Sequence, residues 1–190
     1  MRIISGEFRG RRLKSPRGGD LRPTSDRLKE TLFNILGPEI SGSIFLDVFA
    51  GTGAIGLEAL SRGALAAVFV ESSKEAVQLI RQNIELCGIA SRCRILPGDV
   101  FTLLRTLARE SFTADVAFLD PPYHWGPYRD LLETLFRTGI ARPGSRVVIE
   151  HHRKAALPEA GEGFRCVRVV RQSDKCLSFY QAADRVTNDK

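Results

Sequence analysis

Apolar residues follow two alternating patterns through the central part of the chain. Short runs rich in Val, Ile and Phe predict buried strands, and the longer stretches between them, with apolar residues three or four positions apart, predict helices. Strands separated by helical stretches of about 10–15 residues imply right-handed crossovers and a parallel sheet covered on both faces. We therefore predict a doubly wound α/β domain. The expected strands are Ile44–Phe49, Ala66–Glu71, Cys93–Leu96, Asp115–Asp120 and Arg146–Glu150, and the expected helices begin near Ala54, Ser73, Val100 and Pro127.

The pattern changes after Glu150. Two further strands are predicted at Phe164–Val170 and Cys176–Gln181, joined by a tight turn at residues 171–174. Consecutive strands joined by such a turn form an antiparallel hairpin. The expected fold is therefore Rossmann-like, with a seven-stranded, mostly parallel sheet that ends in an antiparallel hairpin.

The N-terminal segment has a different pattern. Within residues 2–14, apolar residues are interspersed with Arg and Lys, and Gly6 and Gly10 mark turns, which favours a short β-hairpin over a helix. A loop follows to Pro23, and residues 24–26 can cap a helix that Gly37 and Pro38 end. We predict three regions: a hairpin arm with its loop, residues 1–23; a domain, residues 24–183; and a tail that frays, residues 184–190.

Composition and charge narrow the class of protein. With 190 residues, 43% hydrophobic and 26% charged, the chain has the composition of a folded domain and not of a disordered or low-complexity chain. Residues 1–30 contain nine Lys and Arg against four acids, a net charge of +5 out of +6 for the whole chain. A basic segment on a nearly neutral body favours a polyanionic partner such as nucleic acid. An ordinary solvated hairpin is the alternative.

Several classes of protein lack their expected signals. No run approaches the roughly 20 apolar residues of a membrane span, and the N-terminus is charged where a signal peptide would be apolar, so a cytoplasmic protein is expected. The four cysteines form no C-x-x-C pair, and the three histidines lack ligand spacing. We expect reduced, mostly buried thiols and no metal site.

A glycine-rich loop, Asp47 to Gly53, follows the first core strand. Open α/β sheets bind ligands at this edge, and glycines let the backbone approach them closely. With Gly56 the loop also matches G-x-G-x-x-G, and Glu71 stands 20 residues after Gly51, as in dinucleotide-binding folds. A nicotinamide-dependent oxidoreductase and a purely structural turn are therefore alternatives. Asp47 opposes the former, because its carboxylate would repel a pyrophosphate but suit a cationic ligand.

A second motif, Asp120-Pro121-Pro122-Tyr123, ends the fourth core strand at the same edge. Two prolines have no backbone N–H, so this loop presents hydrogen-bond acceptors and suits a donor-rich group such as an exocyclic nucleobase amine. Tyr123 offers a face on which a base can stack. A loop that only ends a strand is the alternative. The downstream His124, Trp125 and Tyr128 are assigned either to a base pocket or to core packing, and Glu150, His151 and His152 to a solvated edge.

Together these motifs resemble a known set. Asp47-x-Phe49-x-Gly51-x-Gly53 with Glu71, Asp99 and Asp120-Pro121-Pro122-Tyr123 is similar, in order, to the motifs of class I S-adenosylmethionine-dependent amino-methyltransferases. Residues 2–13 and 21–34 resemble the RsmD family, which methylates the exocyclic N2 amine of a guanine in 16S rRNA of the small ribosomal subunit. The similarity extends from Arg2 to about Tyr180. Ser5 stands where that family has a second glycine.

The resemblance implies a role for individual residues. It implies a class I methyltransferase fold that holds S-adenosylmethionine, with Glu71 at the ribose, Asp99 and Val100 at the adenine, and Asp120, Pro121, Pro122 and Tyr123 as the catalytic loop around the target amine. The methionine end would lie at Asp47, Ala50, Gly51 and Gly53, with Thr52 and Ser72 also in the cofactor site. The predicted RNA contacts are Arg2, Arg9, Arg11, Arg12, Lys14, Arg22, Thr24 and Arg27.

The implied substrate is 16S rRNA, within an assembled or assembling small subunit, and the protein is expected to act as a monomer. A DNA adenine-N6 methyltransferase shares the Asp-Pro-Pro-Tyr motif but usually carries a separate target-recognition region, for which 190 residues leave little room. A nicotinamide-dependent oxidoreductase and a non-catalytic rRNA-binding assembly factor are the alternatives from other classes.

Overall fold

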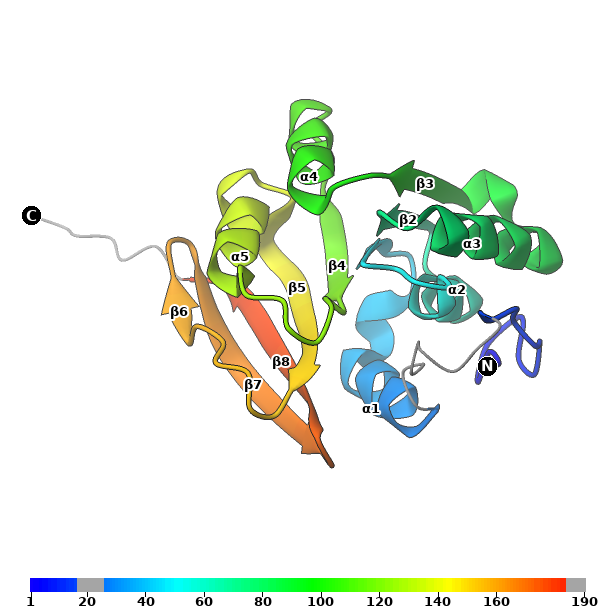
Figure 1. Ribbon diagram of the computed structural model, residues 1–190, viewed down its shortest axis with the longest axis horizontal. Coiled ribbons are helices and arrows are strands. Elements are labelled where there is room, and N and C mark those ends of the chain that lie inside the picture. The colour runs from blue at the N-terminus through cyan, green and yellow to red at the C-terminus, as the bar shows by residue number, and fades with distance from the viewer. Residues whose placement is uncertain (17–25, 184–190) are drawn as a thin grey trace, which may run out of the picture.

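A computed structural model describes residues 1–16 and 26–183, in which one mixed sheet has the strand order β3-β2-β1-β4-β5-β8-β7-β6 (Figure 1). Strands β1 to β5 are parallel, and β8 and β7 add to β5 in antiparallel pairing. This confirms the predicted α/β fold and terminal hairpin. The strands are β1 (Ile44–Val48), β2 (Ala66–Glu71), β3 (Cys93–Pro97), β4 (Ala114–Leu119), β5 (Ala141–His152), β6 (Ala160–Gly161), β7 (Phe164–Gln172) and β8 (Lys175–Ala182).

The predicted count of seven strands is one too low. The additional strand, β6, contains two residues that pair with the start of β7. So short a strand has no alternating pattern by which a sequence could reveal it. Strand β5 also begins at Ala141, before the expected Arg146, because the sheet accommodates Pro143 and Gly144 in an irregular stretch where the β4–β5 register shifts.

Five α-helices cover the two faces of the sheet. Buried residues of α1, α2 and α3 share one hydrophobic cluster, and those of α4 and α5 share the other, so the sheet is covered on both faces as predicted (Figure 1). Two helices begin with side-chain caps, because Ser73 accepts a hydrogen bond from Ala76 N–H and Asp99 accepts one from Thr102 N–H. The helices are α1 (Asp26–Leu36), α2 (Ala54–Ser61), α3 (Lys74–Cys87), α4 (Val100–Arg109) and α5 (Tyr128–Arg137), with 3₁₀ turns η1 (Gly37–Ile40) and η2 (Ala90–Arg92).

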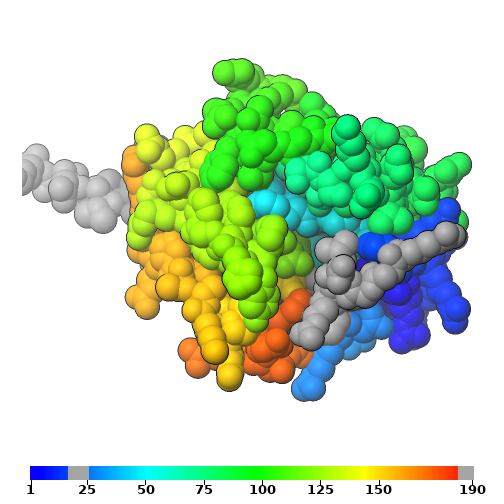
Figure 2. Space-filling model, in the orientation of Figure 1, coloured from blue at the N-terminus to red at the C-terminus, as the bar shows by residue number. Residues whose placement is uncertain are grey.

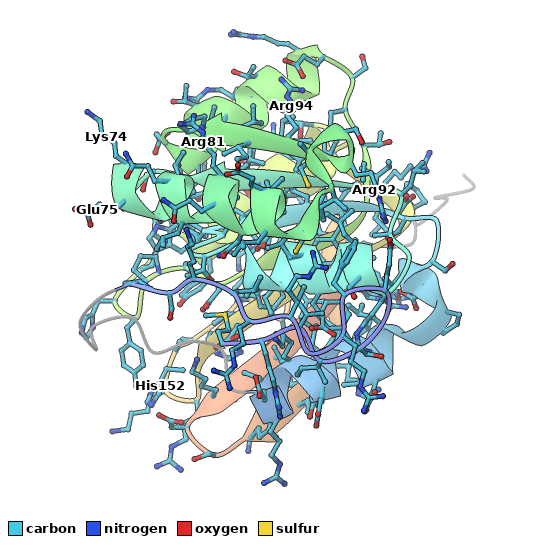
Figure 3. All side chains as sticks on the ribbon, turned by 90° about the vertical axis from the view of Figure 1, so that its right-hand side faces the viewer. Lys74, Glu75, Arg81, Arg92, Arg94 and His152 are labelled. Carbon is cyan, nitrogen blue, oxygen red and sulfur yellow. The ribbon has the colours of Figure 1, made fainter. Side chains whose placement is uncertain are left out.

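The N-terminal segment, residues 1–16, folds back on itself as the predicted short hairpin, but irregularly and without two regular strands. It makes one isolated antiparallel bridge, between Arg2 and Arg12, and turns at Gly6 and Gly10, both with positive φ. Three of its apolar side chains, Ile3, Phe8 and Leu13, are buried in the same hydrophobic cluster as α1, α2 and α3. These burials act together with backbone hydrogen bonds such as that from the Ile3 N–H to the Arg11 carbonyl, and the segment is packed onto the body (Figure 3).

Polar groups of the body complete this packing. The buried Glu58 carboxylate of α2 accepts the Ile4 N–H at 2.8 Å and the Ser5 N–H at 3.0 Å. Lys29 of α1 is also buried, lies 3.5 Å from Glu58 and donates to the Arg2 carbonyl. One of the nine cations counted in residues 1–30 is therefore part of an internal ion pair and adds nothing to a binding surface.

Two remaining expectations concern cysteines and membrane association. All four cysteines are free thiols, but only Cys87 and Cys176 are buried, while Cys93 and Cys166 are partly exposed. Across residues 1–16 and 26–183, no helix has both the length and the apolar character needed to span a bilayer. The predicted helix cap at residues 24–26 falls largely, and the predicted tail wholly, outside the described residues.

Candidate cofactor and target site

Four carboxylates lie in a row at the carboxyl edge of the sheet. Strands β2 and β4 both pair in parallel with β1, and Glu71 and Asp120 each stand two positions beyond the residue paired with Asp47. Leu119 pairs with Ile149, so the next positions along β4 and β5, Asp120 and Glu150, are neighbours. Because side chains alternate between the faces of a sheet, all four acids belong to the face that α1, α2 and α3 cover.

Asp47 is buried against the start of α2. Its Oδ2 accepts the Gly56 N–H at 2.9 Å. Burial raises the pKa of Asp47 well above its usual range, and Asp120 and Glu71 act in the same direction against the Gly56 hydrogen bond. A Cβ atom at Gly56 would lie 2.4 Å from the Phe69 ring, so this glycine is required for packing. For Gly56, the alternative that the glycine motif serves helix–strand packing is therefore correct.

Gly51 is different, because its surroundings are open. Its φ is +57°, and a Cβ atom there would have no neighbour within 4 Å. Its N–H donates to Glu71 Oε2 at 2.8 Å, while Glu71 Oε1 accepts the Ser73 N–H at 2.9 Å. Each oxygen of a carboxylate can accept more than one hydrogen bond, so Glu71 anchors the loop and retains acceptor capacity for a ligand.

Two other features of the loop were not predicted. Phe49 has a φ of +59°, a conformation that non-glycine residues rarely adopt and that is concentrated at functional sites. Thr52 is buried, its Oγ1 lies 3.5 Å from the Met1 sulfur, and its carbonyl accepts from Asn83. The Thr52 side chain is thus directed towards the N-terminal segment, whereas Ala50, Gly51 and Gly53 form the loop itself.

The residues predicted at the adenine lie at the next strand end. Asp99 follows β3, is exposed and caps α4, and the Thr102 N–H lowers the pKa of its carboxyl. Val100 is buried with the α4 side of the core, so only its backbone is placed to contact a ligand. The Gly98 N–H donates to the Glu71 carbonyl at 2.9 Å, which joins this turn to the end of β2.

A cavity of about 810 Å³ opens beside the glycine loop. It is lined by Gly51, Glu71 and Ser73 on one side and by Gln78 of α3 and Lys14 of the N-terminal segment on the other. Its volume lies within the range of small-molecule sites. In Figure 2 the cyan surface around residue 50 is recessed between the surfaces of neighbouring segments.

The Asp120–Tyr123 loop does not line this cavity but follows β4 beside the glycine loop, where the Asp120 N–H donates to the Val48 carbonyl at 3.3 Å. The Pro122 carbonyl accepts the Trp125 N–H at 2.8 Å, which closes a tight turn. Desolvation of the half-buried Asp120 carboxyl raises its pKa to about 8, with Glu150 acting in the same direction and Lys175 against it. The strand register places Asp120 at the same sheet edge as the glycine loop, as the sequence predicted.

Aromatic residues after the loop separate into two groups. Trp125 makes ring contacts with Phe49, Phe101 and Tyr128 at centroid distances of 5.3, 6.2 and 5.3 Å. Core packing is therefore the correct assignment for Trp125 and Tyr128, and Trp125 joins the Asp120–Tyr123 loop to the glycine loop. Tyr123 is 59% exposed, with its ring centroid 4.7 Å from that of His152.

The assignment of Glu150 to a solvated edge was wrong. Glu150 is buried, with 1% of its surface exposed, and Lys175 Nζ of β8 contacts its Oε1. His151 is also constrained, since its Nε2 lies 2.8 Å from Ser178 Oγ. The position of Glu150 directly after an apolar strand, as for Asp120, was the available signal for Glu150. No comparable signal marks Lys175.

The predicted RNA contacts in residues 1–16 and 27 are exposed. Arg11 lies over the Phe8 ring at 5.4 Å and donates to the Leu86 carbonyl of α3, and Lys14 reaches the cavity. Figure 3 shows the segment running along α2 and beneath α3, whose Lys74 and Glu75 point outwards. Arg22 and Thr24 lie outside the described residues. The exposed predicted contacts are Arg2, Arg9, Arg11, Arg12, Lys14 and Arg27.

The sequence is similar to those of known rRNA methyltransferases. A protein of Bacillus subtilis described as "Putative rRNA methyltransferase YlbH" is 36% identical over 159 residues, covering 84% of this chain and 86% of that protein. The Escherichia coli ribosomal RNA small subunit methyltransferase D is 35% identical over 158 residues, covering 83% of this chain and 78% of that protein.

A solved structure and a family model match nearly the whole chain. The E. coli structure described as "Putative methyltransferase yhhF" has a TM-score of 0.84 and 33% identity, covering 96% of this chain and 97% of that one. The family model described as "Conserved hypothetical protein 95" matches residues 1–181. The chain therefore belongs to this family, the RsmD family.

Proposed function

We propose that the protein transfers a methyl group from S-adenosylmethionine to the exocyclic N2 amine of a guanine in 16S rRNA. The observation that carries this proposal is the placement of two complementary loops at one sheet edge: an open glycine loop anchored by Glu71, and an acceptor-rich loop at Asp120. Membership of a family whose relatives are named as small-subunit rRNA methyltransferases supports it.

The charges of the site fit the proposed cofactor. S-adenosylmethionine carries a sulfonium and an ammonium group, and Asp47, Glu71 and Asp120 give the edge an excess of carboxylates. A dinucleotide would instead place a pyrophosphate at this edge, where burial, with Asp120 and Glu71 acting in the same direction, already raises the pKa of Asp47 and so disfavours further negative charge. This opposes the nicotinamide-dependent alternative.

In the mechanism, each residue has a distinct task. Glu71 holds the ribose hydroxyls and Asp99 the adenine amine, while Gly51 lets the backbone approach the methionine end. When bound, S-adenosylmethionine supplies a methyl group on an electrophilic sulfur. The chain mainly orients the two partners and excludes water, which can contribute several kcal/mol.

The target loop acts on the amine. The lone pair of a guanine N2 amine is delocalised into the ring, which makes the nitrogen a weak nucleophile. The Asp120 carboxylate and the Pro121 carbonyl accept its hydrogens and favour a pyramidal nitrogen, while Tyr123 stacks on the base. The surplus proton leaves to solvent. The base must be unpaired or flipped out to enter this site.

The proposal also covers how the protein contacts its RNA and in which particle it acts. The exposed cations of residues 1–16 and Arg27 contact phosphates, while Asp120 to Tyr123 hold the target base. We infer that the protein acts as a monomer in the cytoplasm, on 16S rRNA within an assembled or assembling small subunit.

Labelled-methyl transfer tests the proposal. Small-subunit particles and naked rRNA from cells that lack the gene are incubated with the protein, and the product is digested to nucleosides. We expect label in N2-methylguanosine. In a parallel reaction with DNA, label in N6-methyladenine would favour the DNA methyltransferase. In calorimetry, binding of NAD without binding of S-adenosylhomocysteine would favour the oxidoreductase. Cofactor-independent rRNA binding without transfer would indicate an assembly factor.

A further inference from the structure

A buried ion pair stands directly beside the proposed target loop. Glu150, at the end of β5, is 1% exposed, and Lys175, at the start of β8, contacts it through Nζ. Lys175 itself keeps 26% of its side-chain surface exposed. None of the motifs that resemble the methyltransferases includes either residue.

The sheet register places this pair next to Asp120. Asp120 and Glu150 occupy neighbouring positions beyond the Leu119–Ile149 pair. Across the antiparallel β5–β8 junction, His152 pairs with Lys175, and Glu150 stands two positions before His152 on the same face. The Lys175 ammonium thus contacts Glu150, which is the last of the four carboxylates in the row from Glu71 to Glu150.

Within residues 1–16 and 26–183, Glu150 and Lys175 are the charged groups that act on Asp120. Burial and Glu150 raise the pKa of Asp120 and Lys175 lowers it, and Asp120 in turn acts on Asp47 and on Tyr128 of α5. Burial lowers the pKa of Lys175, but Glu150, with Asp120 and Asp174 acting in the same direction, raises it above its usual value. Lys175 therefore stays charged beside these three acidic groups.

We propose that Lys175 is a positioning residue for methyl transfer: its ammonium, held in place by buried Glu150, favours the carboxylate form of Asp120, which accepts the target amine. This inference rests on the proposed function, because it assigns the ion pair a task in that reaction. A pair that only stabilises the junction of β5 and β8 is the competing explanation.

The two explanations predict different pH profiles of kcat/KM. The acid limb of this profile reports the pKa of the essential base in the free enzyme, here Asp120. Lys175→Met removes a positive charge near Asp120, so the limb should move to higher pH by about one unit. Glu150→Gln removes a negative charge, so the limb should move to lower pH by a similar amount. Lys175→Arg keeps the charge and should leave the limb in place.

A structural ion pair would not produce opposite shifts, since loss of either partner would lower activity at every pH. Lys154→Met, which removes an exposed cation from the loop after β5, is the matched control and should leave the profile unchanged. The double variant Glu150→Gln with Lys175→Met should return the limb towards its original position.

Shifts of the acid limb in the same direction, or no shift in either variant, would overturn the proposal. If Lys175→Met does not fold, Lys175→Gln takes its place: a limb at higher pH supports the role of Lys175, and an unchanged limb refutes it. The affinity for S-adenosylhomocysteine should change less than a few-fold in each folded variant. Wild-type protein that transfers no methyl group to small-subunit RNA at any pH would refute the proposed function, and the positioning role with it.

Discussion

The two halves of the carboxyl edge stabilise their acidic groups in different ways. In the proposed cofactor half, formed by β3, β2 and β1, backbone N–H groups bond to Asp99, Glu71 and Asp47. In the proposed target half, formed by β4, β5 and β8, the side chain of Lys175 balances Asp120 and Glu150.

This difference has a physical consequence. Backbone donors in a tight loop cannot be removed by a side-chain substitution, so the cofactor half presents a fixed set of acceptors. An ammonium on a flexible stem adjusts the charge of its neighbours instead. The cofactor half is therefore built for constant geometry, and the target half for control of the protonation of Asp120.

The largest effect should come from the target half. We expect Asp120→Ala to abolish methyl transfer while the affinity for S-adenosylhomocysteine stays within a few-fold, because the substitution removes the side-chain acceptor for the target amine but touches no cofactor anchor. Nucleoside analysis and calorimetry measure the two effects. Asp130→Ala, at an exposed position of α5, serves as the control. Turnover retained by Asp120→Ala would remove Asp120 from the reaction.

The converse effect should appear in the cofactor half. Glu71→Ala should weaken S-adenosylhomocysteine binding by about 1.5–3 kcal/mol, the usual range for hydrogen bonds to a charged group. It also removes the acceptor of the Gly51 N–H, so the loop is no longer anchored. Glu85→Ala on the exposed side of α3 should leave affinity unchanged. If Glu71→Ala binds as tightly as the wild type, Glu71 is structural only.

The N-terminal segment is tied to the cofactor half through Asn83, which bonds both to Lys14 and to the Thr52 carbonyl. Gly6 and Gly10 both have positive φ, but only at Gly6 would a Cβ atom clash, 1.7 Å from the Ser61 carbonyl oxygen. Gly6→Ala should therefore cost about 1–3 kcal/mol of unfolding free energy more than Gly10→Ala. Equal costs in a denaturant titration would show that the segment is loosely attached.

The smallest effect concerns the exposed cations of the segment. Replacing Arg9, Arg11 and Arg12 by Ala should flatten the plot of log RNA affinity against log salt by up to about 0.7–0.9 for each phosphate that the variant no longer neutralises. The modified nucleotide should not change, because phosphate contacts position a protein without specifying sequence. Replacing Arg105 and Arg109 of α4 should leave the slope intact. An unchanged slope in the triple variant would exclude contact between the segment and the RNA backbone.

The sequence was sufficient for features determined by neighbours in the chain. The alternation of apolar runs identified the core strands, and the motif acids that end β1, β2 and β4 reach one edge because parallel strands share their direction. The path of the N-terminal segment was not predictable, because buried contacts with α2 determine it. The Glu150–Lys175 pair was hidden for a similar reason: it forms across an antiparallel junction of residues 25 positions apart.

A crystal structure with bound S-adenosylhomocysteine would test the division of this edge most directly. We expect the ribose hydroxyls within hydrogen-bonding distance of the Glu71 carboxylate, and the sulfur facing Asp120 across the opening of the glycine loop. A nucleoside bound on the other side of Asp120, against Glu150 and Lys175, would contradict the assignment of the two halves.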